Sequence, residues 1–221
     1  MKKTRAVLAA AALGAALLAS ACAPAAEQKP DAAAGEPVII KVAAVQAPMT
    51  DVVEAAGEAI EDGYEVQLVE VADYVTANTI LASGDVYANF SQHVPYMETF
   101  NEGNDANLVG VQPVYNFVIA FYSKTLDDIA DLPDGAKVAI PDDPSNTGRA
   151  LKLLAANDII ALDPEVDPYA STVKDITENP KNLEFIQVPI SSLNAAYEEA
   201  DLVFQWPSHI KALGLTPRRT A

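Results

Sequence analysis

Residues 138–149 read Val138-Ala139-Ile140-Pro141-Asp142-Asp143-Pro144-Ser145-Asn146-Thr147-Gly148-Arg149, and this stretch is the most informative in the chain. A short apolar run is broken by two prolines and a polar cluster, and a run rich in alanine and leucine follows over residues 150–156. This order predicts a strand, a turn and then a helix. The first turn of such a helix carries free backbone N–H groups and the positive end of the helix dipole.

The start of this predicted helix is a candidate anion site. Asn146 offers an amide, and Arg149 offers a fork of N–H donors with the shape that a carboxylate requires. The alternative is an ordinary capped surface helix with a solvated arginine, because capped helix starts are common. The stretch alone leaves both interpretations open.

Strand-like and helix-like patterns alternate along the rest of the chain. Predicted strands cover residues 39–45, 65–71, 86–90, 108–111, 117–122, 137–140, 183–188 and 202–205. Predicted helices cover residues 51–62, 74–82, 95–100, 147–156, 172–177 and 193–199. This alternation is typical of an α/β fold in which helices cover both faces of the sheets.

The N-terminus has the pattern of a secretory signal. Three cationic residues lie within positions 2–5, and a small and apolar run over residues 6–18 follows, shorter than the about 20 residues that span a bilayer. The only cysteine, Cys22, comes directly after small residues, a placement that resembles a bacterial lipobox, in which Cys22 is lipidated and becomes the mature N-terminus. The alternative is a plain cleaved signal with an incidental cysteine. We expect a signal peptide over 1–21, a disordered tether over 22–37, and an extracytoplasmic folded part anchored to a membrane of the cell envelope.

Composition bounds the class of protein. The chain has 221 residues, 50% of them hydrophobic, which is enough for one or two compact domains. Its net charge is -17, and loss of residues 1–21 removes three positive charges and no acid, which leaves -20. A surface this acidic argues against nucleic acid as a partner. Two histidines are too few for most zinc catalysis, so we expect no metal and no cofactor.

Six blocks elsewhere in the chain resemble, in the same order, the methionine-binding lipoprotein family of the MetQ and NlpA type. Members of this family are the solute-binding subunits of methionine ABC importers. The blocks are Lys41-Val42-Ala43-Ala44-Val45, Val71-Ala72-Asp73-Tyr74, Ser83-Gly84-Asp85-Val86-Tyr87-Ala88-Asn89, Gln92-His93-Val94-Pro95-Tyr96, Glu178-Asn179-Pro180-Lys181-Asn182-Leu183 and Gly214-Leu215-Thr216-Pro217. The loop at 142–149 is similar to the family's binding loop, and the resemblance runs from about Val38 to Pro217.

The resemblance implies a two-lobed periplasmic-binding-protein fold, type II-like, with two crossing strands at the hinge. Lobe one would take residues 38–115 together with 205–221, and lobe two residues 116–204, with crossings near 116–122 and 202–206. An amino acid, methionine or a relative, would bind between the lobes and be delivered to an ABC permease in the cytoplasmic membrane. We expect a monomer that is not an enzyme. An enzyme of the cell envelope is the rival class, although the chain lacks a Gly-x-Ser-x-Gly elbow and a His-Glu-x-x-His motif.

The resemblance also implies a set of ligand-binding residues. Arg149 would clamp the ligand's carboxylate, and Asn146 would bind its carboxylate or amine. Tyr74 and His93 would enclose the ligand's side chain, where a thioether packs well against ring edges. Gln92, Phe90, Tyr115 and Trp206 complete the predicted ligand-binding set. The alternatives are a structural histidine at position 93, a loop cap at position 92, and core aromatic residues at positions 90 and 115.

The chain departs from the family pattern at three places. Ser91 stands where the family has Phe, and Trp206 stands where it has an Asn that recognises the ligand's α-group; Gln205 matches that Asn only with a one-residue shift. Family members also run on beyond the position of Ala221 with a strand and a closing helix. We therefore keep, as the alternative to a working binding protein, a truncated or degenerate member that binds no ligand.

Overall fold

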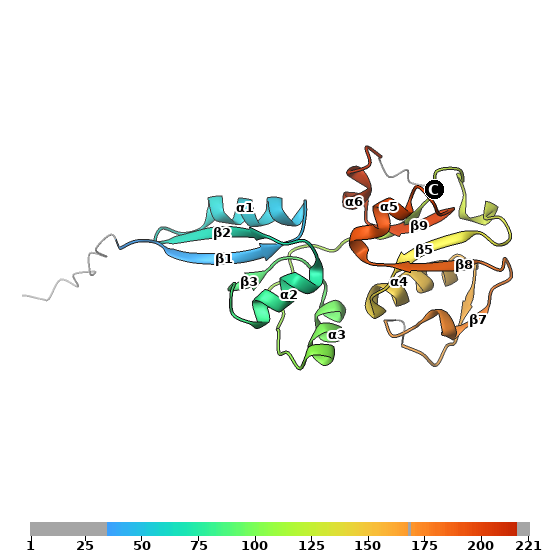
Figure 1. Cartoon of the computed structure of the whole chain (residues 1–221), viewed down its shortest axis with the longest axis horizontal. Coiled ribbons are helices and arrows are strands. Elements are labelled where there is room, and N and C mark those ends of the chain that lie inside the picture. The colour runs from blue at the N-terminus through green and yellow to red at the C-terminus, as the bar shows by residue number, and fades with distance from the viewer. Residues whose placement is uncertain (1–34, 168, 216–221) are drawn as a thin grey trace, which may run out of the picture. The chain divides into compact units, whose positions relative to one another are not determined.

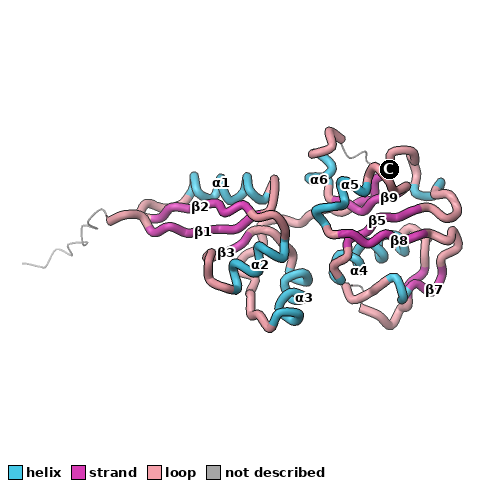
Figure 2. Tube along the Cα trace, viewed as in Figure 1, coloured by secondary structure: helices cyan, strands magenta, loops and turns pink. Residues whose placement is uncertain are grey.

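The computed structural model describes residues 35–167 and 169–215 of the chain. The strands are β1 (Val38–Ala44), β2 (Tyr64–Glu70), β3 (Ala88–Asn89), β4 (Ala120–Tyr122), β5 (Lys137–Pro141), β6 (Ala161–Leu162), β7 (Ile176–Glu178), β8 (Glu184–Val188) and β9 (Leu202–Gln205). The α-helices are α1 (Met49–Ala59), α2 (Tyr74–Ala82), α3 (Val94–Asn104), α4 (Pro144–Ala155), α5 (Leu193–Ala196) and α6 (Pro207–Lys211). The 3₁₀ turns are η1 (Ile129–Asp131), η2 (Val173–Asp175) and η3 (Ile190–Ser192). Figure 1 labels most of these elements, and Figure 2 separates helix, strand and loop.

The first sheet is parallel, in the order β2-β1-β3. Neighbouring residues of β1 face opposite sides of the sheet, as the pleat of a strand requires. Ala44 therefore packs with Met49 and Val53 of α1, whereas Ala43 packs with Ala77 of α2. Figure 1 shows α1 and α2 on opposite sides of these strands, so both faces of the sheet are covered.

The second sheet has the order β4-β9-β5-β8, with β5 parallel to β8 and β9, and β4 antiparallel to β9. Its two inner strands, β5 and β9, are mostly apolar because both of their faces are buried: Val138, Ala139 and Ile140 of β5 have no exposed surface. Leu151 and Leu154 of α4 and Leu193 of α5 belong to the same hydrophobic cluster. A separate two-stranded sheet pairs β6 with β7.

The parallel strands position the candidate site because the loops after them carry the predicted residues. The chain leaves β5 into α4 at Asp143, leaves β2 toward Tyr74, and leaves β3 toward residues 90–93. Loops at the carboxyl ends of parallel strands are the usual ligand-bearing loops of open α/β sheets. The α/β prediction is confirmed by this architecture, whereas the predicted lobe boundaries at 115/116 and 204/205 stay a prediction.

Several sequence-based expectations for single elements are wrong. Residues 108–111 and 117–119 form no strand: Val109 and Val111 are 76% and 91% exposed, so this apolar run is not a core strand. Residues 172–177 form not a helix but the 3₁₀ turn η2 followed by the start of β7, because Thr172 and Asp175 form a capping box that closes a single turn. The short helix α6, with Pro207 in its first turn, was not predicted.

Candidate ligand-binding site

Asp143 organises the start of α4. Its carboxylate accepts from the backbone N–H of Asn146 at 2.9 Å and from the Ser145 hydroxyl at 2.8 Å, which makes it the N-cap of the helix. The hydroxyl of Thr147 donates to the backbone carbonyl of Pro141 at 2.8 Å and so ties the helix back to β5. Ser145, Asn146 and Thr147 are buried by these contacts, so the turn is rigidly held.

The side-chain amide of Asn146 connects the carboxylate of Asp143 with the guanidinium of Arg149. Its amide nitrogen donates to both carboxylate oxygens of Asp143, at 3.1 and 3.0 Å, and its amide oxygen accepts from Nη1 of Arg149 at 2.9 Å. Burial lowers the pKa of the Arg149 guanidinium, and the nearby Tyr169 and Asp143 act in the opposite direction. A guanidinium has five N–H donors, so the bond to Asn146 orients Arg149 and leaves donors for a ligand.

His93 lies close to Arg149. Burial, together with the smaller effect of the positive charge of Arg149, lowers the pKa of its imidazole to about 4. The ring is therefore neutral at pH 7. Its Nε2 atom is buried and has no hydrogen-bond partner in the part of the chain that the structure describes. A buried polar atom without a partner is costly, so this nitrogen is available for a further hydrogen bond.

Aromatic rings extend from His93 in two directions. Its ring centroid lies 6.5 Å from that of Tyr96 and 6.4 Å from that of Tyr169, and Tyr96 in turn lies 6.1 Å from Tyr74. Burial raises the pKa of Tyr74 to about 12 and also raises that of Tyr96. The structure thus brings Tyr74, His93 and Arg149 into one array. It adds Tyr96 and Tyr169, which the sequence analysis did not select, although Tyr96 stands in one of the blocks quoted above.

Gln92 is occupied by a structural contact. Its amide exchanges two hydrogen bonds with the amide of Asn78, at 2.8 and 2.6 Å, and Asn89 donates to the same Asn78 oxygen at 2.7 Å. Asn78 is fully buried and was not foreseen, because a lone Asn within a helical pattern carries no signal of its tertiary partners. The loop-capping alternative for Gln92 therefore has direct structural support.

Phe90 and Tyr115 pack edge to face, with ring centroids 5.6 Å apart, and Tyr115 contacts Phe117 at 4.6 Å. Phe90 borders the hydrophobic cluster that contains Tyr74, whereas Tyr115 is 38% exposed.

Trp206 lies in the core of the second sheet. It is 7% exposed, stacks edge to face on Phe204 at 5.3 Å and belongs to the core cluster of the second sheet. Among the described residues its ring contacts are with Phe204 and His209, not with the array around Arg149.

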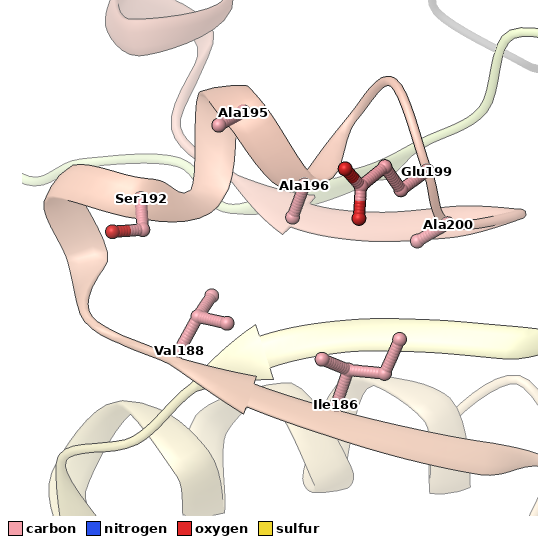
Figure 3. A pocket seen from close by; sticks show the side chains of 7 residues that line it. All are labelled: Ile186, Val188, Ser192, Ala195, Ala196, Glu199 and Ala200. Carbon is pink, nitrogen blue, oxygen red and sulfur yellow. The ribbon is translucent and has the colours of Figure 1, made fainter.

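We compare two hollows in the described part of the chain. One of about 290 Å³ is lined by Ile119, Arg149, Lys152, Leu153, Ala156 and Tyr169, and this volume is close to the lower end of small-molecule sites, roughly 300 Å³. The other, of about 210 Å³, lies between β8 and α5 (Figure 3), and Glu199 is its only charged lining residue. The first hollow contains one residue of the predicted ligand-binding set, Arg149.

The remaining predictions concern anchoring and metals. Cys22 and the signal peptide over 1–21 lie outside the described residues. Over residues 35–167 and 169–215, no helix has the length and apolar character needed to cross a membrane. The same residues contain no group of three or more His, Cys, Asp or Glu side chains arranged to hold a metal ion.

Known proteins resemble this chain in sequence and in fold. Residues 40–221 match the family described as NlpA lipoprotein. The chain is 36% identical over 186 residues to the methionine-binding lipoprotein MetQ of Bacillus subtilis, an alignment that covers 82% of this chain and 68% of that protein.

Two solved structures of solute-binding proteins resemble the fold of this chain. A periplasmic substrate-binding protein of an ABC transporter from Coxiella burnetii superposes with a TM-score of 0.76 at 32% identity. A nutrient-binding protein from Burkholderia cenocepacia, solved bound to methionine, superposes with a TM-score of 0.76 at 34% identity. Each match covers 82% of this chain and 77% of the other. These matches confirm the predicted periplasmic-binding-protein fold.

Proposed function

Because the chain belongs to the NlpA lipoprotein family, whose members are non-enzymatic solute-binding lipoproteins of ABC transporters, we propose that it binds methionine or a close relative. Family membership agrees with the prediction that the chain is not an enzyme, and it implies lipid anchoring in the cell envelope. We further propose that Cys22 carries the lipid, and that the protein is a monomer that delivers its ligand to an ABC permease. The methionine bound to the Burkholderia relative supports the choice of ligand.

The observation that carries the proposal is the Asp143–Asn146–Arg149 chain beside the neutral His93. A free amino acid has a carboxylate and an ammonium group, so its site needs donors and a negative charge within a short distance. The free donors of Arg149 suit the carboxylate, and Asp143, held by Asn146, supplies the negative charge for the ammonium. Both groups are oriented before the ligand arrives, which reduces the entropy lost on binding.

The rings around His93 suit an apolar side chain. Tyr74, Tyr96 and Tyr169 present ring edges and faces, and a thioether sulfur makes favourable contacts with ring edges of about 0.3–1.5 kcal/mol. One departure from the family favours a more polar relative as the second candidate. Ser91 is 6% exposed, and its hydroxyl has no hydrogen-bond partner among the described residues. A ligand with a polar side-chain group would satisfy it.

A thermal-shift screen of the purified lipoprotein in detergent tests the proposal. A ligand that binds only the folded state raises stability by about 2.7 kcal/mol at a hundredfold excess over its Kd, which shifts the melting temperature by on the order of 5 to 10 °C. We expect this shift with methionine, tested as both enantiomers, and none with methioninol, which lacks the carboxylate. The panel includes serine, glutamine and threonine for the polar alternative. A melting temperature that no amino acid moves would contradict the proposal and favour a family member without ligand binding.

A further inference from the structure

Three polar side chains that are distant in the sequence meet in the structure. Gln46 follows β1, Tyr74 begins α2, and His209 lies in α6. The Nε2 atom of Gln46 is 2.8 Å from the Nε2 atom of His209 and 3.4 Å from the Tyr74 hydroxyl, which is itself 3.4 Å from His209 Nε2. Tyr74 and His209 are 7% and 5% exposed, and Gln46 is half-buried.

The nature of the groups determines which one donates. In the orientation that the Gln46 amide has in the structure, its nitrogen donates to His209 Nε2, which puts the hydrogen of a neutral imidazole on Nδ1. Burial lowers the pKa of His209 to about 4, which agrees with a neutral ring at pH 7. Nε2 has a single lone pair, and Gln46 occupies it. Tyr74 therefore accepts from Gln46, and its own hydroxyl hydrogen is free for another acceptor.

His209 is held in place by residues of the second sheet and of α5. The backbone carbonyl of His209 accepts from the Asn194 amide at 3.1 Å, and the Asn194 amide oxygen accepts from the Gln205 amide at 2.7 Å. The Trp206 ring lies against the imidazole with centroids 5.1 Å apart. Trp206, one of the departures from the family pattern, thus supports the position of His209.

We propose that His209 is a positioning residue for the ligand. His209 orients the Gln46 amide, and that amide donates to the oxygen of the Tyr74 hydroxyl. The hydrogen of the Tyr74 hydroxyl is then left to donate to an acceptor atom of the ligand. The inference rests on the proposed function, because it takes Tyr74 as a ligand-contacting residue. The acceptor on the ligand is a carboxylate oxygen or a side-chain oxygen or sulfur. The bound ligand then provides the partner that the buried O–H group otherwise lacks.

The first arm of the test needs no ligand. Nitrogen NMR of ¹⁵N-histidine distinguishes the two imidazole tautomers, and the chain has two histidines in all, so the spectrum is simple. We expect His209 to be neutral with its hydrogen on Nδ1 at pH 7, and Gln46→Leu to shift its Nε2 resonance. Lys211→Ala, which changes an exposed residue of the same helix, is the control and should shift it little. A hydrogen on Nε2, or no response to Gln46→Leu, overturns the inference.

The second arm is a double-mutant cycle on methionine affinity, measured by calorimetry. His209→Leu should weaken binding by about tenfold, the effect of about one hydrogen bond, and His209→Gln should restore most of it because its amide oxygen accepts from Gln46. In a Tyr74→Phe background, His209→Leu should cost nothing further. An equal loss in both backgrounds, or no loss in either, overturns the inference.

The outcomes of the two arms can be told apart. If His209→Leu shows no cooperative thermal transition, Gln46→Leu replaces it in the cycle, because Gln46 is only half-buried. Methionine binding with the wrong tautomer rejects the positioning role and leaves the proposed function intact. A wild-type chain that shows the expected tautomer but binds no amino acid rejects the proposed function, and with it the ligand role of Tyr74.

Discussion

Arg149 and Asn146 work as one unit at the start of α4. The amide oxygen of Asn146 accepts a hydrogen bond from Arg149, and its amide nitrogen donates to the carboxylate of Asp143. A flexible arginine would lose side-chain entropy when it bound a ligand, whereas this one is already oriented. The two sequence-based interpretations of this segment, a capped helix and an anion site, are therefore compatible, since Asp143 provides the cap and leaves Arg149 available.

Replacing Arg149 with Ala should abolish the thermal response to methionine. A hydrogen bond to a charged group contributes about 1.5–3 kcal/mol, so the loss of a two-pronged contact weakens binding by at least a hundredfold. Arg149→Lys keeps the charge but loses the fork, and should retain part of the affinity. Lys137→Ala removes an exposed cation from β5 and is the control. A full response in Arg149→Ala would remove this residue from the site.

Asn78 should be a stability residue and not a ligand contact. Asn78→Leu leaves the amides of Gln92 and Asn89 without their partner in a buried place, so we expect a loss of about 1–3 kcal/mol in the free energy of unfolding. Urea denaturation measures this loss, and Asn157→Ala, at an exposed position, should change it little. Equal stabilities for the two variants would show that the amide cluster is not needed for the fold.

At the scale of single elements, local signals determined α2 and α4 well. The predicted helix over 74–82 coincides with α2, because Asp73 caps its first turn and Gly84, with a φ of +82°, ends it. The predicted helix over 147–156 begins three residues later than α4, because Asp143 rather than a residue nearer Thr147 is the cap. Proline at the first helical position is compatible with that start.

Asp143 has a structural role as the N-cap of α4 and a proposed electrostatic role toward the ligand, and two substitutions distinguish these roles. Asp143→Ala removes the cap and should cost about 1 kcal/mol of stability, within the usual range of about 0.5–2 kcal/mol. Asp143→Asn keeps an oxygen for the backbone N–H of Asn146 but loses the negative charge, so it should preserve stability and weaken amino-acid binding. Urea denaturation and calorimetry on both variants check this. If Asp143→Asn bound methionine as tightly as the wild type, Asp143 would not be the partner of the ammonium group.

At the scale of the whole molecule, the fold keeps both histidines neutral at pH 7: His209 is buried and His93 is half-buried. Burial lowers the pKa of each imidazole to about 4, with Arg149 adding to the effect at His93. An unfolded histidine titrates near 6.5, so between about pH 6.5 and 4 the unfolded state binds more protons than the folded one. The free energy of unfolding therefore decreases as the pH falls through this window.

We expect the His209 share of this acid sensitivity to be roughly 3 kcal/mol by pH 4, because one pKa unit corresponds to about 1.4 kcal/mol. His209→Gln cannot titrate, so its stability should decline less steeply than that of the wild type between pH 6.5 and 4. Urea denaturation at a series of pH values compares the two slopes, and the carboxylates common to both proteins cancel. Parallel curves would show that His209 keeps its ordinary pKa in the folded chain.

The fold class, the family resemblance and most elements with strong local signals were predictable from the sequence alone. Strand runs such as 137–140 and caps such as Asp73 and Asp143 act over a few residues, so their effect is visible in a short stretch. The motif blocks also pointed to His93, Tyr74 and Arg149, whose proximity the structure shows.

The hydrogen-bond and packing partners of the site residues became visible only in the folded structure. Asn78 with Gln92 and His209 with Gln46 are pairs separated by 14 and 163 residues, and no local pattern encodes them. The same holds for Trp206, which aligns with a ligand-binding position of the family but packs in the core of the second sheet. The exposed run over 108–111 failed as a strand for the same reason. A strand or a polar contact depends on a partner that folding brings from elsewhere in the chain, and that partner is invisible from the residue itself.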